Sequence, residues 1–334
     1  MDHLAIDLGG RESQICVRRA DGAVLEERRC RTSGLAAYLA SRPHSRVIVE
    51  TCSEAFRIAD AALAAGHEVR VVPATLVRTL GVGARGIKTD RRDAQVLSEV
   101  SCQIDLPSVH IPCAETRARK TLCGMREGLV QARTQLINTV RGWLRAEGRL
   151  PRSGDTAIFP ARVRAQASPC PAYVERQLRA IDALTTEIAA ADRELAALTR
   201  RDPLLQRCLT VPGVGPVTAV RFVAALDDRA RFPGAHAVES YLGLTPGEDS
   251  SAGRRRRTSI TKAGPAAVRW CLVQAAWAAR RTRRKDPIHR WVDAIVQRRG
   301  VRIAILALAR KLAGILYAIW RDGTVYEPRR ASLA

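Results

Sequence analysis

Short apolar runs alternate with helical patterns over the first third of the chain. Runs of strand length lie at 4–8, 46–50 and 68–73, and the segment 14–28 contains two further runs around Asp21-Gly22, a dipeptide typical of a β-hairpin. Helical spacing of apolar residues predicts helices at 35–39, 55–65 and 90–100. This order of strands, hairpin and helices predicts an α/β domain over residues 1–110.

Apolar residues recur every three or four positions through most of the remaining chain. Residues 115–147 and 173–199 therefore predict two long helices, separated by a break that contains Pro and Ser. We interpret 111–202 as a helical region in which the two helices either pair as an antiparallel coiled hairpin that mediates assembly or form an ordinary linker.

Residues 203–330 predict a third, mainly α-helical domain. A polar, basic stretch at 247–264 interrupts it and is expected to be a loop. The expected helices lie at about 217–226, 235–242, 265–281, 286–298 and 301–320.

The charge of the chain narrows the class of partner. Its 334 residues include 55 Lys and Arg against 33 Asp and Glu, a formal net charge of +22. Such an excess indicates a polyanionic partner. No apolar run reaches about 18 residues without a charge, and the first residues lack a basic signal-peptide region, so we expect a cytoplasmic protein with no membrane partner.

The spacing of the cysteines and the low aromatic content argue against two further classes of site. The nine cysteines are scattered and form no CxxC pair, which argues against a zinc ribbon and favours reduced thiols. Aromatic residues make up 4% of the chain, which argues weakly against a stacking platform for single strands.

Four acidic residues form the first candidate site. Asp7 and Glu50 lie at the ends of predicted strands, and Asp90 and Asp93 are three residues apart, on one face of a predicted helix. Such carboxylates can converge into an oxygen cage for one or two Mg²⁺ ions in phosphoryl transfer. The alternative is that Asp7 is a loop acid and that Asp90 and Asp93 cap their helix.

A glycine-rich turn and basic clusters form candidate nucleic-acid contacts. Gly213 and Gly215, in a Pro-Gly-x-Gly turn before a helix, predict a helix-hairpin-helix element whose backbone N–H groups bind phosphate. A plain helix–helix turn is the alternative. The basic clusters at 280–285 and 298–299 are expected to contact phosphates.

Two adjacent serines in the basic stretch are the candidate nucleophiles. Ser250 and Ser251 precede a group of cationic residues, which can stabilise charge developing on a phosphoryl group during serine attack. The alternative is a loop that only holds phosphates. The predicted phosphate contacts are Arg254, Arg255, Arg256, Arg257 and Lys262.

These motifs together resemble the transposases of insertion-sequence family one-ten, which are related to the Piv-type DNA invertases. The amino half is similar through Ala5-Ile6-Asp7, Val47-Ile48-Val49-Glu50 and Lys88-Thr89-Asp90-Arg91-Arg92-Asp93-Ala94, the family's K-T-D-x-x-D-A pattern. The carboxyl half is similar through Pro212-Gly213-Val214-Gly215, Gly243-Leu244-Thr245-Pro246 and Ile260-Thr261-Lys262-Ala263-Gly264.

The resemblance implies a RuvC-like, ribonuclease-H-like first domain whose Asp7, Glu50, Asp90 and Asp93 bind Mg²⁺, and a carboxyl domain with a serine nucleophile. It also implies a composite active site between domains, homo-oligomers (a dimer or tetramer), a structured non-coding RNA as guide, and a transient phosphoserine link to element and target DNA. Counting from Gly243 favours Ser251 as the nucleophile, whereas counting back from Lys262 permits Ser250.

Two rival functions remain at this point. The first is a RuvC-like, structure-selective nuclease that uses the acids alone and forms no covalent intermediate. The second is a non-catalytic nucleic-acid-binding protein.

Overall fold

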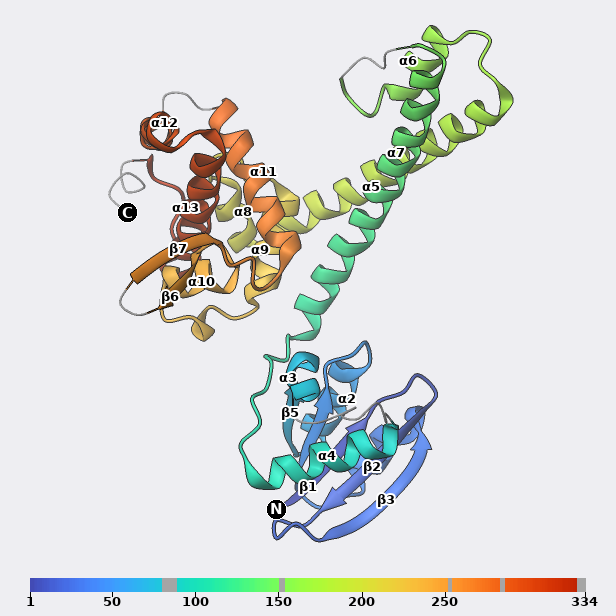
Figure 1. Cartoon of the computed structure of the whole chain (residues 1–334), viewed down its shortest axis with the longest axis vertical. Coiled ribbons are helices and arrows are strands. Elements are labelled where there is room, and N and C mark those ends of the chain that lie inside the picture. The colour runs from blue at the N-terminus through green and yellow to red at the C-terminus, as the bar shows by residue number, and fades with distance from the viewer. Residues whose placement is uncertain (80–88, 150–153, 252–253, 283–285, 329–334) are drawn as a thin grey trace. The chain divides into compact units, whose positions relative to one another are not determined.

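A five-stranded mixed sheet organises the first unit, Met1–Pro112, of a computed structural model (Figure 1). Its order is β3-β2-β1-β4-β5, in which β1 to β3 are antiparallel and β1, β4 and β5 are parallel. The strands are β1 (Asp2–Asp7), β2 (Glu12–Arg18), β3 (Val24–Arg31), β4 (Ser45–Glu50) and β5 (Glu68–Val72). The predicted α/β class is confirmed, and this order is compatible with a ribonuclease-H-like fold.

The structure describes residues 1–79, 89–149, 154–251, 254–282 and 286–328. Within these ranges, the side chains of residues 78, 250, 251, 254–257 and 282 are not described. Lys88 and the basic residues 283–285 therefore lie outside the described residues.

Helices cover both faces of this sheet because its central strands are apolar at every inner position. Leu4, Ile6 and Val49 pack on one face with α2 (Ala55–Ala64), whereas Ala5 and Ile48 pack on the other with α4 (Asp90–Gln103). Successive strand residues alternate between the two faces of a sheet, so this division follows from the sequence of each strand. The helices are α1 (Leu35–Ala40), α2 (Ala55–Ala64), α3 (Ala74–Thr79) and α4 (Asp90–Gln103).

Two long helices, α5 (Ala114–Ala146) and α7 (Ala172–Arg201), pair antiparallel in the second unit, Cys113–Ala334. Arg119 pairs with Asp202, the residue that follows α7, whereas Arg126, further along α5, pairs with Asp192, earlier in α7. The two helices therefore run in opposite directions. The buried cluster around Leu144 and Leu178 continues this pairing toward α6 (Phe159–Gln166).

A helical bundle around α13 (Val301–Asp322) completes the second unit. By length and composition α13 is apolar enough to cross a membrane, but Leu308, Leu312 and Leu316 are fully buried in the bundle, as in the core helix of a globular unit. The bundle helices are α8 (Pro203–Leu209), α9 (Pro216–Leu226), α10 (Ala235–Tyr241), α11 (Ala266–Thr282), α12 (Pro287–Arg299) and α13 (Val301–Asp322).

The expected boundary near residue 202 does not separate two units. Cys123 of α5 and Leu195 of α7 belong to the same buried cluster as Phe222 of α9 and Leu272 of α11. The first part of α5 and the last part of α7 are thus included in the bundle core. Burying their apolar faces there joins 113–334 into one unit, while the first boundary falls at residue 112 instead of the expected 110.

Candidate functional site

The first candidate site begins at the carboxyl ends of two parallel strands. Ile6 of β1 lies opposite Val49 of β4, so the next residues, Asp7 and Glu50, end neighbouring strands at the same edge of the sheet. Both residues are half-buried. Residues two apart in a strand share a face, and Ala5 and Ile48 pack toward α4. Asp7 and Glu50 therefore belong to the face that α4 covers.

Helix α4, which carries the other two acids, crosses the same face of the sheet. His3, near the start of β1, bonds Ser101 over 2.8 Å, so the end of α4 lies at the start of that strand. Toward the beginning of α4, Arg91 and Gln95 bond Glu27 of β3, two strands away from β1 in the sheet order. Asp90 and Asp93 therefore lie on the part of α4 that contacts β3.

Asp93 is buried, with 3% of its surface exposed, whereas Asp90, at the first position of α4, is exposed. The N-cap of α4 is Thr89, whose side chain accepts a hydrogen bond from the Arg92 N–H. The capping interpretation of Asp90 is therefore wrong. In a capping box the acid is the third residue after the N-cap, whereas Asp93 is the fourth residue after Thr89. Burial of a carboxylate without a capping role is consistent with a functional role.

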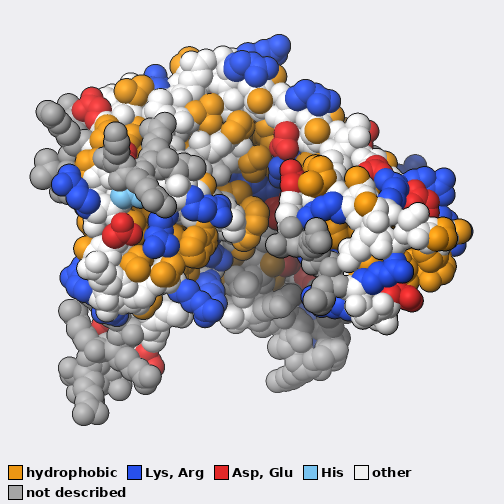
Figure 2. All heavy atoms as spheres, turned by 90° about the horizontal axis from the view of Figure 1, so that it is seen from above, with side chains coloured by type: hydrophobic (Ala, Val, Ile, Leu, Met, Phe, Trp, Pro, Cys, Tyr) orange, Lys and Arg blue, Asp and Glu red, His pale blue; other side chains and the backbone are white. Residues whose placement is uncertain are grey.

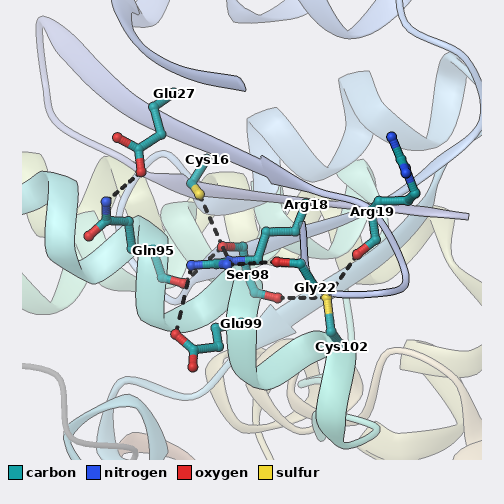
Figure 3. Close-up of polar contacts among 9 residues, drawn as sticks. All are labelled: Cys16, Arg18, Arg19, Gly22, Glu27, Gln95, Ser98, Glu99 and Cys102. Carbon is teal, nitrogen blue, oxygen red and sulfur yellow. Dashed lines mark hydrogen bonds and ion pairs between the residues drawn. The ribbon is translucent and has the colours of Figure 1, made fainter. Parts of the chain in front are cut away.

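A polar network holds α4 against β2 and β3 (Figure 3). Arg18 donates to Ser98 over 3.1 Å, and the Ser98 hydroxyl donates in turn to the Cys16 sulfur. On β3, Glu27 accepts hydrogen bonds from Gln95 and Arg91, which hold the pKa of its carboxyl below the ordinary value. These bonds fix the rotation of α4, and with it the direction in which Asp93 projects.

The donor set of this sheet edge suits a hard cation such as Mg²⁺, which prefers carboxylate oxygens. Within the described ranges, no three or more His, Cys, Asp or Glu side chains are close enough together to hold a metal ion. Carboxylates repel one another, and a bound cation is what favours their close approach. The topology thus brings Asp7 and Glu50 to one edge and places Asp90 and Asp93 on the helix that covers that face, but the acids of the described residues do not form a metal cage.

The second candidate site is a β-hairpin where the sequence predicts a loop. Strands β6 (Pro246–Ser251) and β7 (Arg254–Ile260) pair antiparallel, with Ser250 opposite Arg255 and Ser251 opposite Arg254. Their register also places Glu248 and Asp249 opposite arginine positions, and opposite charges stabilise such pairs. The side chains of both serines and of Arg254, Arg255, Arg256 and Arg257 lie outside the described residues.

Backbone contacts fasten the base of this hairpin. The Thr261 N–H donates to the Thr245 carbonyl over 2.9 Å, and the Lys262 N–H donates to the Gly243 carbonyl over 3.2 Å. A Cβ on Gly264, whose φ is +70°, would lie 1.9 Å from the Tyr241 carbonyl oxygen. The motifs at 243–246 and 260–264 are therefore two sides of one tightly packed junction.

The Pro-Gly-x-Gly turn connects α8 to α9, and its two glycines differ. Gly213 has a φ of +78°, and a Cβ there would lie 2.1 Å from the Ala275 carbonyl oxygen on α11. Close packing against α11 therefore accounts for Gly213. Gly215 is the N-cap of α9 and has open space around its Cβ position. The N–H groups that we expect to bind phosphate are therefore those at this end of the turn.

Comparison with known proteins decides the family. Residues 4–147 match a family of DEDD-type transposases of IS110 elements, and residues 205–290 match the family described as Transposase IS116/IS110/IS902. A probable family 20 transposase of Pseudomonas aeruginosa is 31% identical over 86% of this chain and 87% of its own length. The chain belongs to the IS116/IS110/IS902 family of transposases.

Two further relatives extend over almost the whole transposase. The transposase for insertion sequence element IS1111A of Coxiella burnetii is 27% identical over 95% of this chain and 88% of its own. The transposase for IS1328 of Yersinia enterocolitica is 27% identical over 97% of this chain and 98% of its own. The chain is therefore an enzyme of the class that cleaves DNA and transfers strands, and a divalent metal requirement follows from its DEDD domain.

The two family matches divide between the two candidate sites. The DEDD match covers the sheet edge and α4, and the second match covers the turn, the hairpin and all of α11. Sequence reasoning missed Arg269 on α11, which donates to the carbonyls of Leu242 and Ala263, over 3.0 and 2.9 Å, at the hairpin base. A single arginine in so basic a chain gives no local signal of that role.

Proposed function

We propose that this transposase cleaves and exchanges DNA strands in a Mg²⁺-dependent reaction with Ser251 as the nucleophile. Asp7, Glu50, Asp90 and Asp93 would hold the metal, which when bound would polarise the phosphate that is attacked. What supports this proposal is that Asp7 and Glu50 end neighbouring parallel strands, on the face covered by the helix that carries Asp90 and Asp93, in a chain whose family match includes the DEDD domain.

The serine step exchanges one phosphodiester bond for another. The Ser251 Oγ attacks phosphorus and loses its proton, the bond to the leaving nucleoside oxygen breaks, and that oxygen takes up a proton. The phosphodiester linkage is thereby retained as an ester between Ser251 and the end of the DNA strand. The hydroxyl of the exchanged strand then attacks the same phosphorus and restores the serine. Arginines at 254–257 would stabilise the charge on the phosphoryl oxygens.

Basic surface supports the polyanionic partners in this proposal. Lys and Arg side chains are spread over the face drawn in Figure 2, with hydrophobic side chains between them. We further propose element and target DNA as substrates, an element-encoded structured RNA as guide, and a dimer or tetramer as the active form in the cytoplasm. In this proposal α8, α9 and their turn act as a helix-hairpin-helix contact through Gly215, and α5 and α7 act as a coiled-coil assembly element.

Trapping the transposase on element DNA tests the nucleophile. Wild type should give a covalent protein–DNA adduct, and peptide mapping should place it on Ser251. Ser251→Ala should give no adduct and no strand exchange, with DNA affinity nearly unchanged, because the change removes a hydroxyl and no charge. Ser250→Ala is the matched control at the neighbouring register position and should keep appreciable activity.

Other results would redirect the proposal. Loss of the adduct in Ser250→Ala alone would move the nucleophile by one residue. DNA cleavage without any adduct in wild type and in both variants would contradict a serine nucleophile and favour the nuclease alternative, in which water attacks. Binding without cleavage under all metal conditions would favour the non-catalytic alternative.

A further inference from the structure

A groove of about 780 Å³ lies between α5, α9 and α11 in the second unit. Gln131, Gln135 and Asn138 of α5 line one side, and Trp270 of α11 lines the other. No residue of the hairpin lines it. A volume of this size is in the range that accommodates a small molecule or one part of a larger ligand.

Trp270 offers a free ring to the groove. This residue is 59% exposed, although the next residue, Cys271, is buried and Trp277 packs against the bundle core. An exposed indole on a well-packed helix contributes nothing to the core. Its flat face is suited to stacking on another aromatic ring, and nucleobases stack on tryptophan whatever their sequence.

The opposite wall of the groove carries hydrogen-bonding groups that are not used by the fold. Gln135 and Asn138 are exposed, and their amides make no hydrogen bond within the described part of the chain. Gln131 reaches only the Glu127 carboxylate, over 3.3 Å. Each amide has both donors and an acceptor, as the edge of an unpaired base has.

The charges of the groove argue against a phosphate as its ligand. The Arg221 guanidinium pairs with Glu127 and donates to the Cys123 carbonyl over 2.8 Å, and Arg126 pairs with Asp192. Both cations that line the groove are therefore engaged by the protein. An uncharged ring with polar edges fits such a lining better than an anion does, and a single tryptophan provides for one base.

The groove is adjacent to the hairpin through α11. Arg269 is fixed to the hairpin base by two carbonyls, and Trp270 is the next residue. We propose that this groove binds one unpaired nucleobase of a single-stranded nucleic acid, stacked on Trp270 and hydrogen-bonded by the α5 amides. The proposal rests on the proposed function in taking a nucleic acid as the partner, but it does not require the serine chemistry.

Binding of 12-nucleotide single-stranded probes of one mixed sequence, as oligoribonucleotide and as oligodeoxyribonucleotide, tests this proposal with the full chain. Trp270→Ala should weaken binding of the preferred probe about tenfold, as expected for one lost stack. Trp270→Phe, which keeps a ring, should recover most of the affinity. The salt dependence should stay unchanged, because no phosphate contact is removed. The tighter probe identifies RNA or DNA as the source of the base.

Tyr173→Ala is the matched control, since Tyr173 of α7 is 56% exposed in the same unit and does not line the groove. It should leave probe affinity unchanged. Equal affinity of wild type and Trp270→Ala for both probes would overturn the proposal, and so would a change of oligomeric state in Trp270→Ala, which would mark the groove as a contact between copies. An intact Ser251 adduct beside either result would show that the proposed function stands without this subsite.

Discussion

The two units position their polar residues by opposite means. In the first unit, buried apolar strands end in Asp7 and Glu50, so the core itself delivers the acids to one edge. In the second unit, a hairpin without an apolar face is held at its base by backbone hydrogen bonds and by glycines that admit close contact. The sheet edge thus depends on packing, and the hairpin depends on backbone geometry at a few positions.

Replacement of Asp7 should have the largest effect and tests the sheet edge directly. Asp7→Asn keeps the shape of the side chain but removes a charge that would bind metal, so strand exchange should fall at least about 100-fold. Asp2→Asn is the matched control, because Asp2 begins the same strand at the opposite edge. Strand exchange is the measurement, with thermal unfolding as the check on folding. Full activity of Asp7→Asn would mean that this edge is not the metal site.

Replacement of Gly264 tests the hairpin base and should have the next largest effect. In Gly264→Ala the new Cβ would meet the Tyr241 carbonyl at a φ of +70°, so the free energy of unfolding of the second unit should fall by about 3 kcal/mol. Gly215→Ala, at a position with open space and a negative φ, should cost less than about 1 kcal/mol. Denaturant unfolding measures both, and equal costs would contradict the proposed role of backbone geometry.

The smallest expected effect is a pH dependence confined to the first unit. Burial, and to a lesser extent the nearby Arg46, lower the pKa of His3, which bonds Ser101 of α4. Because the pKa of His3 is lowered in the folded state, neutral His3 contributes its full stabilisation above 6.5, the pKa in the unfolded chain. It is lost as the pH falls through the folded value, at about 1.4 kcal/mol for each pKa unit of difference.

Substitution at His3 isolates this effect. His3→Gln should flatten the pH dependence of unfolding below pH 6.5. His44→Gln, at an exposed histidine of the same unit, should leave it unchanged. An unchanged dependence in His3→Gln would show that the contact between His3 and α4 is not what responds to acid.

Local pattern was enough to predict most elements. The central strands and the long helices were predicted within a few residues, because apolar periodicity reflects the face that each element buries. The hairpin at 246–260 was missed because its residues are polar on both faces, and only the register of acids against arginines makes it recognisable. Thr89 was missed as the cap of α4 because Asp90, beside it, is also a common N-cap residue.

The sequence by itself determined the apolar strands, the helical periods, the excess of positive charge and the motifs that mark the family, since all of these are properties of neighbouring residues. Only the tertiary structure decided that α4 covers the face of the sheet to which Asp7 and Glu50 belong, that Gly213 packs against α11, and that Trp270 and the amides of α5 line one groove. Each of these depends on residues tens of positions apart in the chain, whose approach is decided by the packing of whole helices and strands.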